Sequence, residues 1–494
     1  MSRQWDRREV LGLMAGAVVG ACTPHDPDAT PGPTPSAGTA AENELPGHSG
    51  WRLRRQGADR AIEGFADRVS VLPGHSFRLA VSTTAPHFHA EAFRLGWYGG
   101  AEARRVWRSG TLPGRRHEMP AAGGPTRTVT AAWPMTVRVP TTDWPEGTYL
   151  IRLTASTGEQ RFVPLTVRSA RTAGRVVLVN AVATWQAYNT WGGHSLYQGP
   201  GGKADYGTRS LAVSCDRPYD RDGAHLLLVY EQPAIAVAER TGLPLAYVTS
   251  MDLDADPHLL AGARAVVSLG HDEYWTPAMR ARVTGARDTG TNVAFLGANA
   301  CFRRIRLEPT GYGERRLVVC YKTDWRHDPQ YGVDDAAVTT DWREPPHPEP
   351  ENSLTGTLYE ASGASAAYVV TRPGHWLLHG TGAVQGTRFP NLVGTEYDRV
   401  VDGPFTPRGI DVLAHSPLVC RGVSSFHNSA YYTTRSGSGV FNTGTMRWVE
   451  SLKGDGAHGI PPHTADFTQQ VTRTLLHAFA AGPAADGPSG LVRR

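Results

Sequence analysis

The sequence predicts an α/β doubly wound, mostly parallel sheet, preceded by an all-β domain like an immunoglobulin sandwich. Three observations carry this prediction. Apolar and polar residues alternate in short segments between residues 50 and 168, as in half-buried strands. From residue 175 to residue 296, apolar strands alternate with helices. The chain has 494 residues, enough for two or three domains.

The all-β domain is placed at residues 48–170. Gly- and Pro-rich turns separate its predicted strands, which is typical of a sandwich. The strands are expected at residues 76–82, 92–98 and 135–139, and residues 144–153 are expected to form a turn that leads into another strand. We interpret its aromatic residues as core and rim packing, with a sugar-stacking face as the alternative.

The α/β domain is placed at residues 171–485, and its sheet is expected to be glutamine-amidotransferase-like. Helices are expected at 233–241 and 276–287, where Pro277 suits a first helical turn because its missing N–H is harmless there. After Cys301 the chain reads mainly as strands, up to a final helix at 465–481 and a tail at 486–494. The buried strands are predicted at residues 176–180, 245–248, 266–269 and 292–296.

The N-terminus predicts export. Arg7-Arg8 precedes an apolar stretch too short to span a bilayer, as in a twin-arginine signal. Val19-Gly20-Ala21-Cys22 resembles a bacterial lipobox, so residues 1–22 are expected to be a signal whose Cys22 is lipidated. Residues 23–47 are expected to form a disordered Pro/Thr/Ala linker. This protein would then be anchored on the outer face of the bacterial cytoplasmic membrane; a cleaved signal with an incidental Cys is the alternative.

Composition excludes some partners. Charged residues make up 19% of the chain and the formal net charge is only +4, without a Lys/Arg run, so nucleic acid is not an expected partner. No Cys/His spacing suggests zinc. Oligomers are possible, and three disulfide pairings are open to the cysteines after residue 22, which are Cys215, Cys301, Cys320 and Cys420.

Polar side chains follow three of the predicted strands. The motif Gly270-His271-Asp272-Glu273-Tyr274-Trp275 comes after one of them. Ligands of open α/β sheets bind beyond the carboxyl ends of the strands, so these side chains are expected to lie together. The alternative is that Asp272 or Glu273 only caps the next helix. The residues at the three ends are Tyr188, Tyr197, His271, Glu273 and Asn299.

The chemistry of this edge is narrowed by what the sequence lacks. It has no Gly-x-Ser-x-Gly or Gly-x-Cys-x-Gly motif, so an acyl-enzyme nucleophile is not expected. No Gly-x-Gly-x-x-Gly motif follows the first strand, so a dinucleotide is not expected either. Phenolate and carboxylate oxygens are hard ligands that suit ferric iron better than zinc. Such an ion would polarise a carbonyl group and acidify water.

Together with Gly394-Thr395-Glu396-Tyr397-Asp398, these segments resemble the C-terminal region of the N,N-dimethylformamidase large (beta) subunit. The resemblance implies amide hydrolysis with a mononuclear Fe³⁺ ion held by two tyrosines and one glutamate. Carried over by motif, the ligands are Tyr188, Tyr197 and Glu273.

The same resemblance implies roles for four more residues. His271 and Asn299 would line the pocket, Glu396 would be the acid/base, and Lys322 would match a pocket lysine. Tyr197 follows Tyr188 by only nine positions, whereas a longer insertion is expected between the two ligand tyrosines of the family. The alternatives for the second ligand are therefore Tyr206 and Tyr230.

Two functions follow from these observations. The first is a metal-dependent hydrolase that acts on a non-peptide amide C–N bond of a small molecule, in an exported and membrane-anchored protein. The second is a non-catalytic cell-surface or carbohydrate-binding lipoprotein on the same fold. The set of Tyr, Glu, His and Asn residues at the strand ends favours the first.

Overall fold

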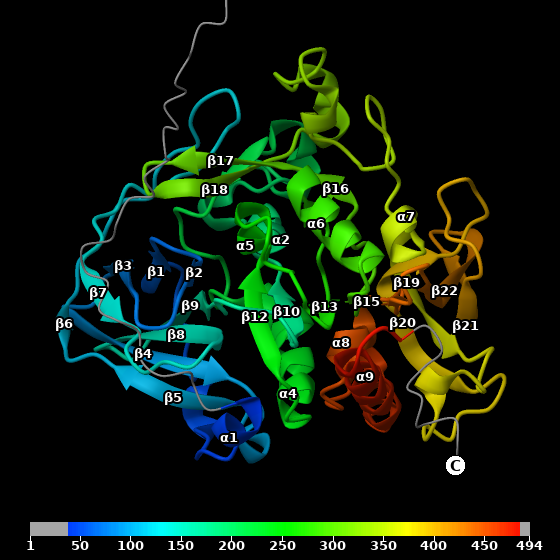
Figure 1. Cartoon of the computed structure of the whole chain (residues 1–494). Coiled ribbons are helices and arrows are strands. Elements are labelled where there is room, and N and C mark those ends of the chain that lie inside the picture. The colour runs from blue at the N-terminus through cyan, green and yellow to red at the C-terminus, as the bar shows by residue number, and fades with distance from the viewer. Residues whose placement is uncertain (1–37, 485–494) are drawn as a thin grey trace, which may run out of the picture.

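The computed structural model describes residues 38–484. In Figure 1 the β-sandwich, a central sheet and a set of C-terminal strands lie side by side. The predicted signal with Cys22 and the predicted tail at 486–494 lie outside the described residues. Of the predicted linker at residues 23–47, the described end contains the helix α1 (Thr39–Asn43).

The N-terminal part consists of two packed sheets. Phe77, Leu79 and Val81 of β3 are buried in the core between them, while Arg78 is exposed, so the predicted alternation places one face of β3 inward. The three-stranded sheet has the order β1 (Ile62–Ala66), β3 (Ser76–Thr83), β7 (Val137–Pro140). The six-stranded sheet has the order β2 (Ser70–Val71), β9 (Gln160–Val167), β8 (Gly147–Ala155), β4 (His87–Leu95), β5 (Ala103–Arg108), with β6 (Leu112–Pro113) paired to β4.

A seven-stranded sheet forms the centre of the molecule. Its first five strands run parallel, and the last two pair antiparallel. The strand order is β12 (Leu245–Thr249), β10 (Val176–Asn180), β13 (Ala265–Ser268), β15 (Asn292–Phe295), β23 (Gly439–Asn442), β22 (Val423–Thr433), β21 (Asp411–Cys420).

Helices cover both faces of this sheet, which explains why its parallel strands carry apolar residues on both faces. On β10, Val176 and Leu178 pack into one core, and Val177 and Val179 pack into another. The first core includes side chains of α4 (Gln232–Arg240) and α9 (Thr464–Ala481), and the second includes those of α5 (Ser250–Ala255) and α6 (Pro277–Asp288). The start of α6 is fixed by Thr276, whose Oγ1 accepts a hydrogen bond from the Met279 N–H at 3.1 Å.

The prediction of a doubly wound, mostly parallel α/β fold is wrong. Strands account for 33% of the residues and helices for 23%, and most of the sheets are mixed or antiparallel. A β-rich fold fits the predicted sandwich only. The antiparallel additions are β21 and β22, the hairpin of β19 (Leu358–Val369) with β20 (Arg388–Arg399), and the sheet of β11 (Ala212–Ser214), β18 (Gly313–Val319) and β17 (Arg306–Thr310).

The connection between β21 and β22 gives the physical reason for this error. Cys420 pairs with Val423, so only Arg421 and Gly422 form the loop, and both have positive φ, 51° and 81°. A two-residue loop of this kind joins only antiparallel strands. The C-terminal strands therefore extend the central sheet by hairpins, without the helical crossovers that a doubly wound fold needs.

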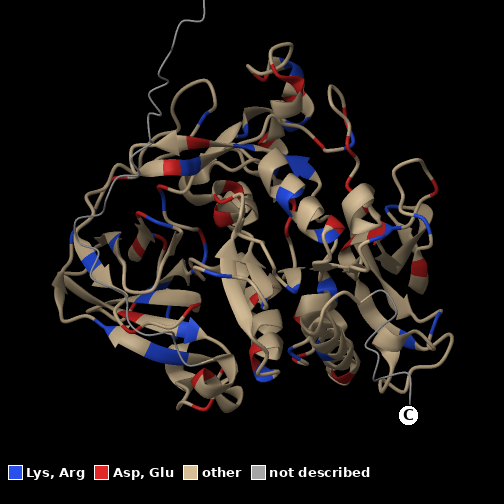
Figure 2. Ribbon diagram, in the orientation of Figure 1, with Lys and Arg blue, Asp and Glu red and all other residues tan. Residues whose placement is uncertain are grey.

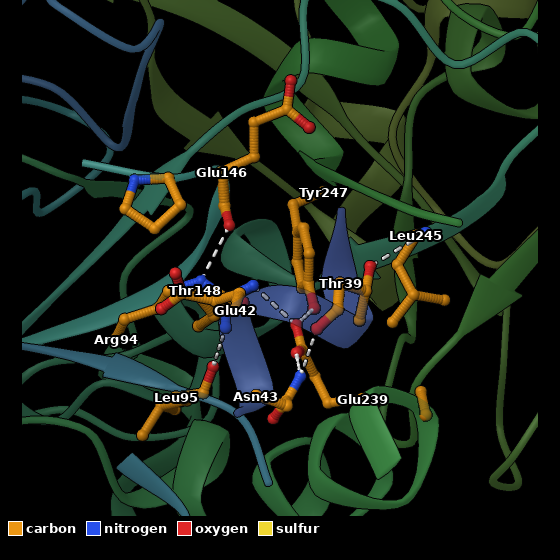
Figure 3. A network of polar contacts seen from close by, with 12 residues as sticks. Thr39, Glu42, Asn43, Arg94, Leu95, Glu146, Thr148, Glu239, Leu245 and Tyr247 are labelled. Atoms are coloured by element: carbon orange, nitrogen blue, oxygen red, sulfur yellow. Dashed lines mark hydrogen bonds and ion pairs between the residues drawn. The ribbon is translucent and has the colours of Figure 1, made fainter. Parts of the chain in front are cut away.

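Helix α1 is tied to the rest of the molecule by a buried polar network (Figure 3). The Tyr98 hydroxyl donates to Glu42 Oε1 at 2.7 Å, and Arg94 Nη1 donates to the Tyr98 hydroxyl at 2.9 Å. Arg94 Nη2 also donates to Glu239 Oε1 of α4 at 2.6 Å. The network thus joins the chain start, the sandwich and the helical layer of the central sheet.

The charged residues are spread over the molecule, and the cysteines are unpaired in the described part of the chain. Basic and acidic residues are interspersed along the ribbon (Figure 2). Over residues 38–484, no helix has the length and apolarity needed to cross a bilayer. The cysteines of the described chain are free and buried; they are Cys215, Cys301, Cys320 and Cys420.

Candidate active site

Three chain segments that leave the central sheet bring the predicted site residues together. The helix α2 (Val182–Tyr188) follows β10 and places Tyr188 at its end. Glu273 comes five residues after β13, and Asn299 comes four residues after β15. Thr184 connects two of these segments, because its Oγ1 accepts hydrogen bonds from the N–H groups of Glu273 at 3.1 Å and Tyr274 at 3.3 Å.

Three oxygen-bearing side chains converge at the centre of the site. The Tyr188 hydroxyl donates to Glu273 Oε2 at 2.6 Å. The Tyr197 hydroxyl lies 2.8 Å from both carboxylate oxygens of Glu273 and 2.9 Å from the Tyr188 hydroxyl. The two tyrosine rings stack with centroids 4.5 Å apart. Burial and the charge of Glu273 raise the pKa of both phenols well above the usual value.

Arg303 and His271 flank the Glu273 carboxylate. Arg303 Nε donates to Glu273 Oε1 at 3.1 Å and also pairs with Asp341, and His271 Nε2 lies 3.6 Å from Glu273 Oε2. Burial opposes ionisation of Glu273, but the charge of Arg303, together with the hydrogen bond from Tyr188, outweighs it and holds the pKa of the carboxyl below its usual range. Burial lowers the pKa of His271, which favours the neutral imidazole.

A second carboxyl group, that of Glu396, belongs to the site. Asn299 Nδ2 donates to Glu396 Oε2 at 3.0 Å, while the Asn299 N–H donates to Asp398 at 2.8 Å. Burial, and next the charge of Glu273, raise the pKa of Glu396 to about 8. A carboxyl group with this pKa gains and loses protons near neutral pH, as a general acid and base must.

Lys322 lies beneath the tyrosines. Its side chain is fully buried, and Nζ lies 3.1 Å from the centroid of the Tyr197 ring. Within the described residues, Nζ has no hydrogen-bond partner. Burial lowers the pKa of Lys322 well below its ordinary value, and the Arg303 charge adds to this effect. The predicted pocket lysine therefore sits at the site, next to a ring and without an acceptor.

The structure distinguishes the three tyrosines considered for the second position. Tyr197 contacts Glu273, whereas Tyr206 is 37% exposed at the cavity opening. Tyr230 packs against the His271 ring with centroids 5.8 Å apart. Tyr197 is thus the tyrosine that joins Tyr188 and Glu273.

Two further residues belong to the site, and the sequence pattern did not predict them. The Tyr274 hydroxyl donates to the Tyr197 hydroxyl at 2.8 Å, and Arg303 neutralises Glu273. Tyr274 lies next to Glu273 in the motif of residues 270–275, so its position in that motif could have indicated it. Arg303 follows Asn299 by four positions, and nothing in its pattern distinguishes it from the many dispersed arginines of the chain.

The donor set fits a hard metal ion. Two phenol oxygens and one carboxylate lie within 2.6–2.9 Å of one another, and hard oxygen ligands suit ferric iron. Within residues 38–484, no group of three or more His, Cys, Asp and Glu side chains is arranged to hold a metal ion. The present set has only one such residue, because its other two donors are tyrosines.

A cavity of about 530 Å³ opens from this centre toward solvent. Its inner wall contains Tyr188, Tyr197, His271 and Glu396. Pro164 of β9 also lines it, so the sandwich contributes to its wall. Its size is within the range of small-molecule sites in proteins.

Comparison with known proteins places the chain in a family. Comparison with curated proteins gives no match. A solved cycloisomaltooligosaccharide glucanotransferase from Paenibacillus sp., complexed with cycloisomaltoheptaose, shows 14% identity and a TM-score of 0.15, over 26% of this chain and 17% of that one. With so low a TM-score, nothing about the fold or function of this chain is concluded from that structure. The family described as N,N-dimethylformamidase beta subunit-like, C-terminal, matches residues 89–464, and the chain therefore belongs to this family.

Proposed function

We propose that this protein hydrolyses the C–N bond of a non-peptide amide at the site around Glu273. The observation that carries the proposal is the convergence of Tyr188, Tyr197 and Glu273 beside a cavity that both tyrosines and Glu396 line. In the reaction, water adds to the acyl carbon and the C–N bond breaks. The products are a carboxylic acid and an amine, so no further reactant is needed.

Glu396 is the proposed proton carrier. Its carboxylate form takes a proton from the attacking water, and the resulting acid delivers that proton to the leaving nitrogen. The hydrogen bond from Asn299 Nδ2 holds the carboxyl group in place. Burial keeps its pKa near 8, so that both forms are accessible at neutral pH.

Tyr188, Tyr197 and Glu273 are the residues that would hold an iron ion. Bound there, the ion would polarise the amide carbonyl and lower the pKa of water. His271 lies 3.6 Å from Glu273 Oε2 and restrains that carboxylate. Thr184 fixes the backbone on which Glu273 sits.

The test compares Tyr188→Phe with a surface control, Tyr331→Phe, whose ring is 44% exposed. Wild-type protein grown with ample iron is expected to contain iron, to be coloured by tyrosinate-to-iron absorption, and to release dimethylamine from N,N-dimethylformamide. Tyr188→Phe is expected to lose the colour and the activity, and Tyr331→Phe to keep both. Colourless, iron-free and inactive wild-type protein would favour the non-catalytic binding function instead.

We also propose that Cys22 carries a lipid that anchors the protein outside the cytoplasmic membrane. The support is the order of Arg7-Arg8, a short apolar stretch and Val19-Gly20-Ala21-Cys22. One lipid-modified residue on a linker would hold the folded part at the membrane surface. Mass spectrometry of the mature protein is expected to show a lipidated Cys22 as the first residue; an unmodified start elsewhere would contradict this.

A further inference from the structure

The cavity is much larger than a formamide with two methyl groups requires. Its volume of about 530 Å³ lies in the range that accommodates drug-sized ligands. The proposed reacting groups are a minority of the residues that line it. Most of its wall is therefore formed by other side chains, against which part of a larger substrate would sit.

The middle of the cavity is lined by large aromatic and aliphatic side chains. Trp185 and Leu227 are buried, and Tyr219 and Tyr230 are partly buried around them. Tyr230 contacts the His271 ring, so this apolar wall is continuous with the reacting end. Aromatic walls of this kind favour an apolar, ring-bearing ligand over a small polar molecule.

Two cations lie at the opening. Lys203 and Arg221 both line the cavity and are exposed. Both side chains thus face the space in which a ligand would lie. The acid Asp220 also lines the cavity, and its partner Thr190, whose N–H donates to Asp220 Oδ2 at 3.1 Å, is neutral and leaves the carboxylate charge in place. With two cations against one carboxylate, this part of the lining keeps a net positive charge.

We propose that the substrate is an amide whose acyl or amine substituent is a long, aromatic arm that ends in a carboxylate. The amide lies at the Tyr188–Glu273 end, the arm lies along Trp185, Leu227 and Tyr230, and the carboxylate pairs with Lys203 and Arg221. The position of the amide in this inference rests on the proposed amide hydrolysis. The aromatic arm and the carboxylate are inferred from the residues that line the cavity.

The experiment uses three amides with the same leaving group. They are N,N-dimethylformamide, N,N-dimethyl-4-phenylbutanamide, and the latter with a para-carboxylate on its ring. We expect kcat/KM to rise by about tenfold or more with the arm and by about tenfold again with the carboxylate, each a step of about 1.4 kcal/mol. Two further probes, neutral and para-carboxylated, carry the same arm on the nitrogen of a formamide, and they test the case in which the arm belongs to the amine and not to the acyl group.

Variants test the proposed contacts. In Lys203→Gln/Arg221→Gln, the ratio of kcat/KM between the carboxylate probe and the neutral arm probe is expected to fall about tenfold. Arg116→Gln, which removes an exposed arginine outside the cavity, is expected to keep that ratio. Rising salt should lower the ratio in the wild type, because exposed charges are screened.

Equilibrium binding separates the two proposals. If calorimetry shows that the carboxylate probe binds, that its binding weakens in Lys203→Gln/Arg221→Gln, and that no amide is cleaved, the ligand class stands and the hydrolysis proposal fails. If N,N-dimethylformamide is cleaved at least as efficiently as every arm probe, the hydrolysis proposal stands and the present inference is overturned. An unchanged charged-to-neutral ratio in the double variant would overturn the carboxylate assignment.

Discussion

Two buried clusters in this molecule are built from the same kinds of side chain. In the first, Glu239 of α4 binds Arg94 at 2.6 Å and accepts a hydrogen bond from the Tyr247 hydroxyl. In the second, Glu273 binds Arg303 at 3.1 Å and accepts one from Tyr188 at 2.6 Å. Each cluster thus has a carboxylate, a guanidinium group and phenols.

The clusters differ in how completely their polar atoms are satisfied. In the first cluster, Arg94 and Tyr247 donate to Glu239 (Figure 3), and Tyr98 donates to Glu42. Among the described residues near Glu273, in contrast, four buried atoms have none: Lys322 Nζ, His271 Nδ1, Asp272 Oδ1 and Asn299 Oδ1. Each such atom costs about 1–3 kcal/mol of stability. A cavity alone does not separate the clusters, since about 230 Å³ of space borders the first. The unsatisfied atoms identify the second as the candidate site.

The largest expected effect is on activity, at Glu396. The Glu396→Gln variant keeps the shape of the side chain and an oxygen for the Asn299 hydrogen bond, but it cannot carry a proton. We expect kcat to fall by about 10²–10⁴-fold, as when general acid–base catalysis is removed. The free energy of unfolding should change by less than about 1 kcal/mol. Release of dimethylamine and denaturant unfolding measure the two quantities.

A matched control is Glu360→Gln, which removes a partly exposed carboxylate paired with Arg399 at 2.7 Å. Its activity should remain within about twofold of the wild type, as expected for a surface substitution. Full activity of Glu396→Gln would remove Glu396 from the mechanism.

In the first cluster, the expected effect is on stability. Glu239→Ala leaves the Arg94 guanidinium buried beside neutral groups, which should lower the free energy of unfolding by about 3–5 kcal/mol. Glu102→Ala is the comparison, because Glu102 pairs with Arg52 on the surface and should contribute less than about 1 kcal/mol. Denaturant unfolding followed by circular dichroism measures both. Equal effects of the two changes would mean that the buried network does not stabilise the fold.

The sequence predicted the second cluster better than the first. Tyr188, Glu273 and Asn299 each follow a predicted strand by a few residues, and local order along the chain was enough to group them. Arg94 and Glu239 lie 145 positions apart, in a predicted sandwich strand and a predicted helix of the α/β domain. Only the packing of the sandwich on the central sheet brings them together, and no local pattern encodes that packing.

The contrast between local patterns and long-range packing also explains why the strands were predicted correctly and the fold class was not. The strands 176–180, 245–248, 266–269 and 292–296 were recognised because apolar runs are a local signal, and the structure has strands at all four. Pairing between strands is not local. Whether β21 and β22 extend this sheet depends on contacts with β23, and the two-residue loop at Arg421-Gly422 was the sole local sign of their antiparallel direction.

A third prediction concerns the pH dependence of hydrolysis. The pKa of Glu396 is raised to about 8, chiefly by burial, so this carboxyl group is protonated below that pH. Because the carboxylate form accepts the proton from water, kcat/KM should rise with pH and level off above about pH 8. At pH 6, two units lower, it should be about 100-fold below the plateau. In Glu396→Gln this limb should disappear from the residual activity. A wild-type profile that is flat from pH 6 to pH 8.5 would contradict the assignment of Glu396 as the base.

The smallest effect is expected when the basic residue of the second cluster, Lys322, is replaced, and Arg94 of the first cluster provides the comparison. Lys322 Nζ is buried without an acceptor, so Lys322→Met replaces an unsatisfied group with an apolar side chain of similar length. The positive φ of 56° at this position strains both residues alike. We expect Lys322→Met to raise the free energy of unfolding by about 1 kcal/mol while lowering activity, as for residues kept for function. Arg94→Met, in contrast, leaves the Glu239 carboxylate buried without its cation and should destabilise the protein. Denaturant unfolding of the two variants beside the wild type measures the difference. If Lys322→Met is instead the more destabilising of the pair, Lys322 supports the fold, and unsatisfied polar atoms no longer separate the two clusters.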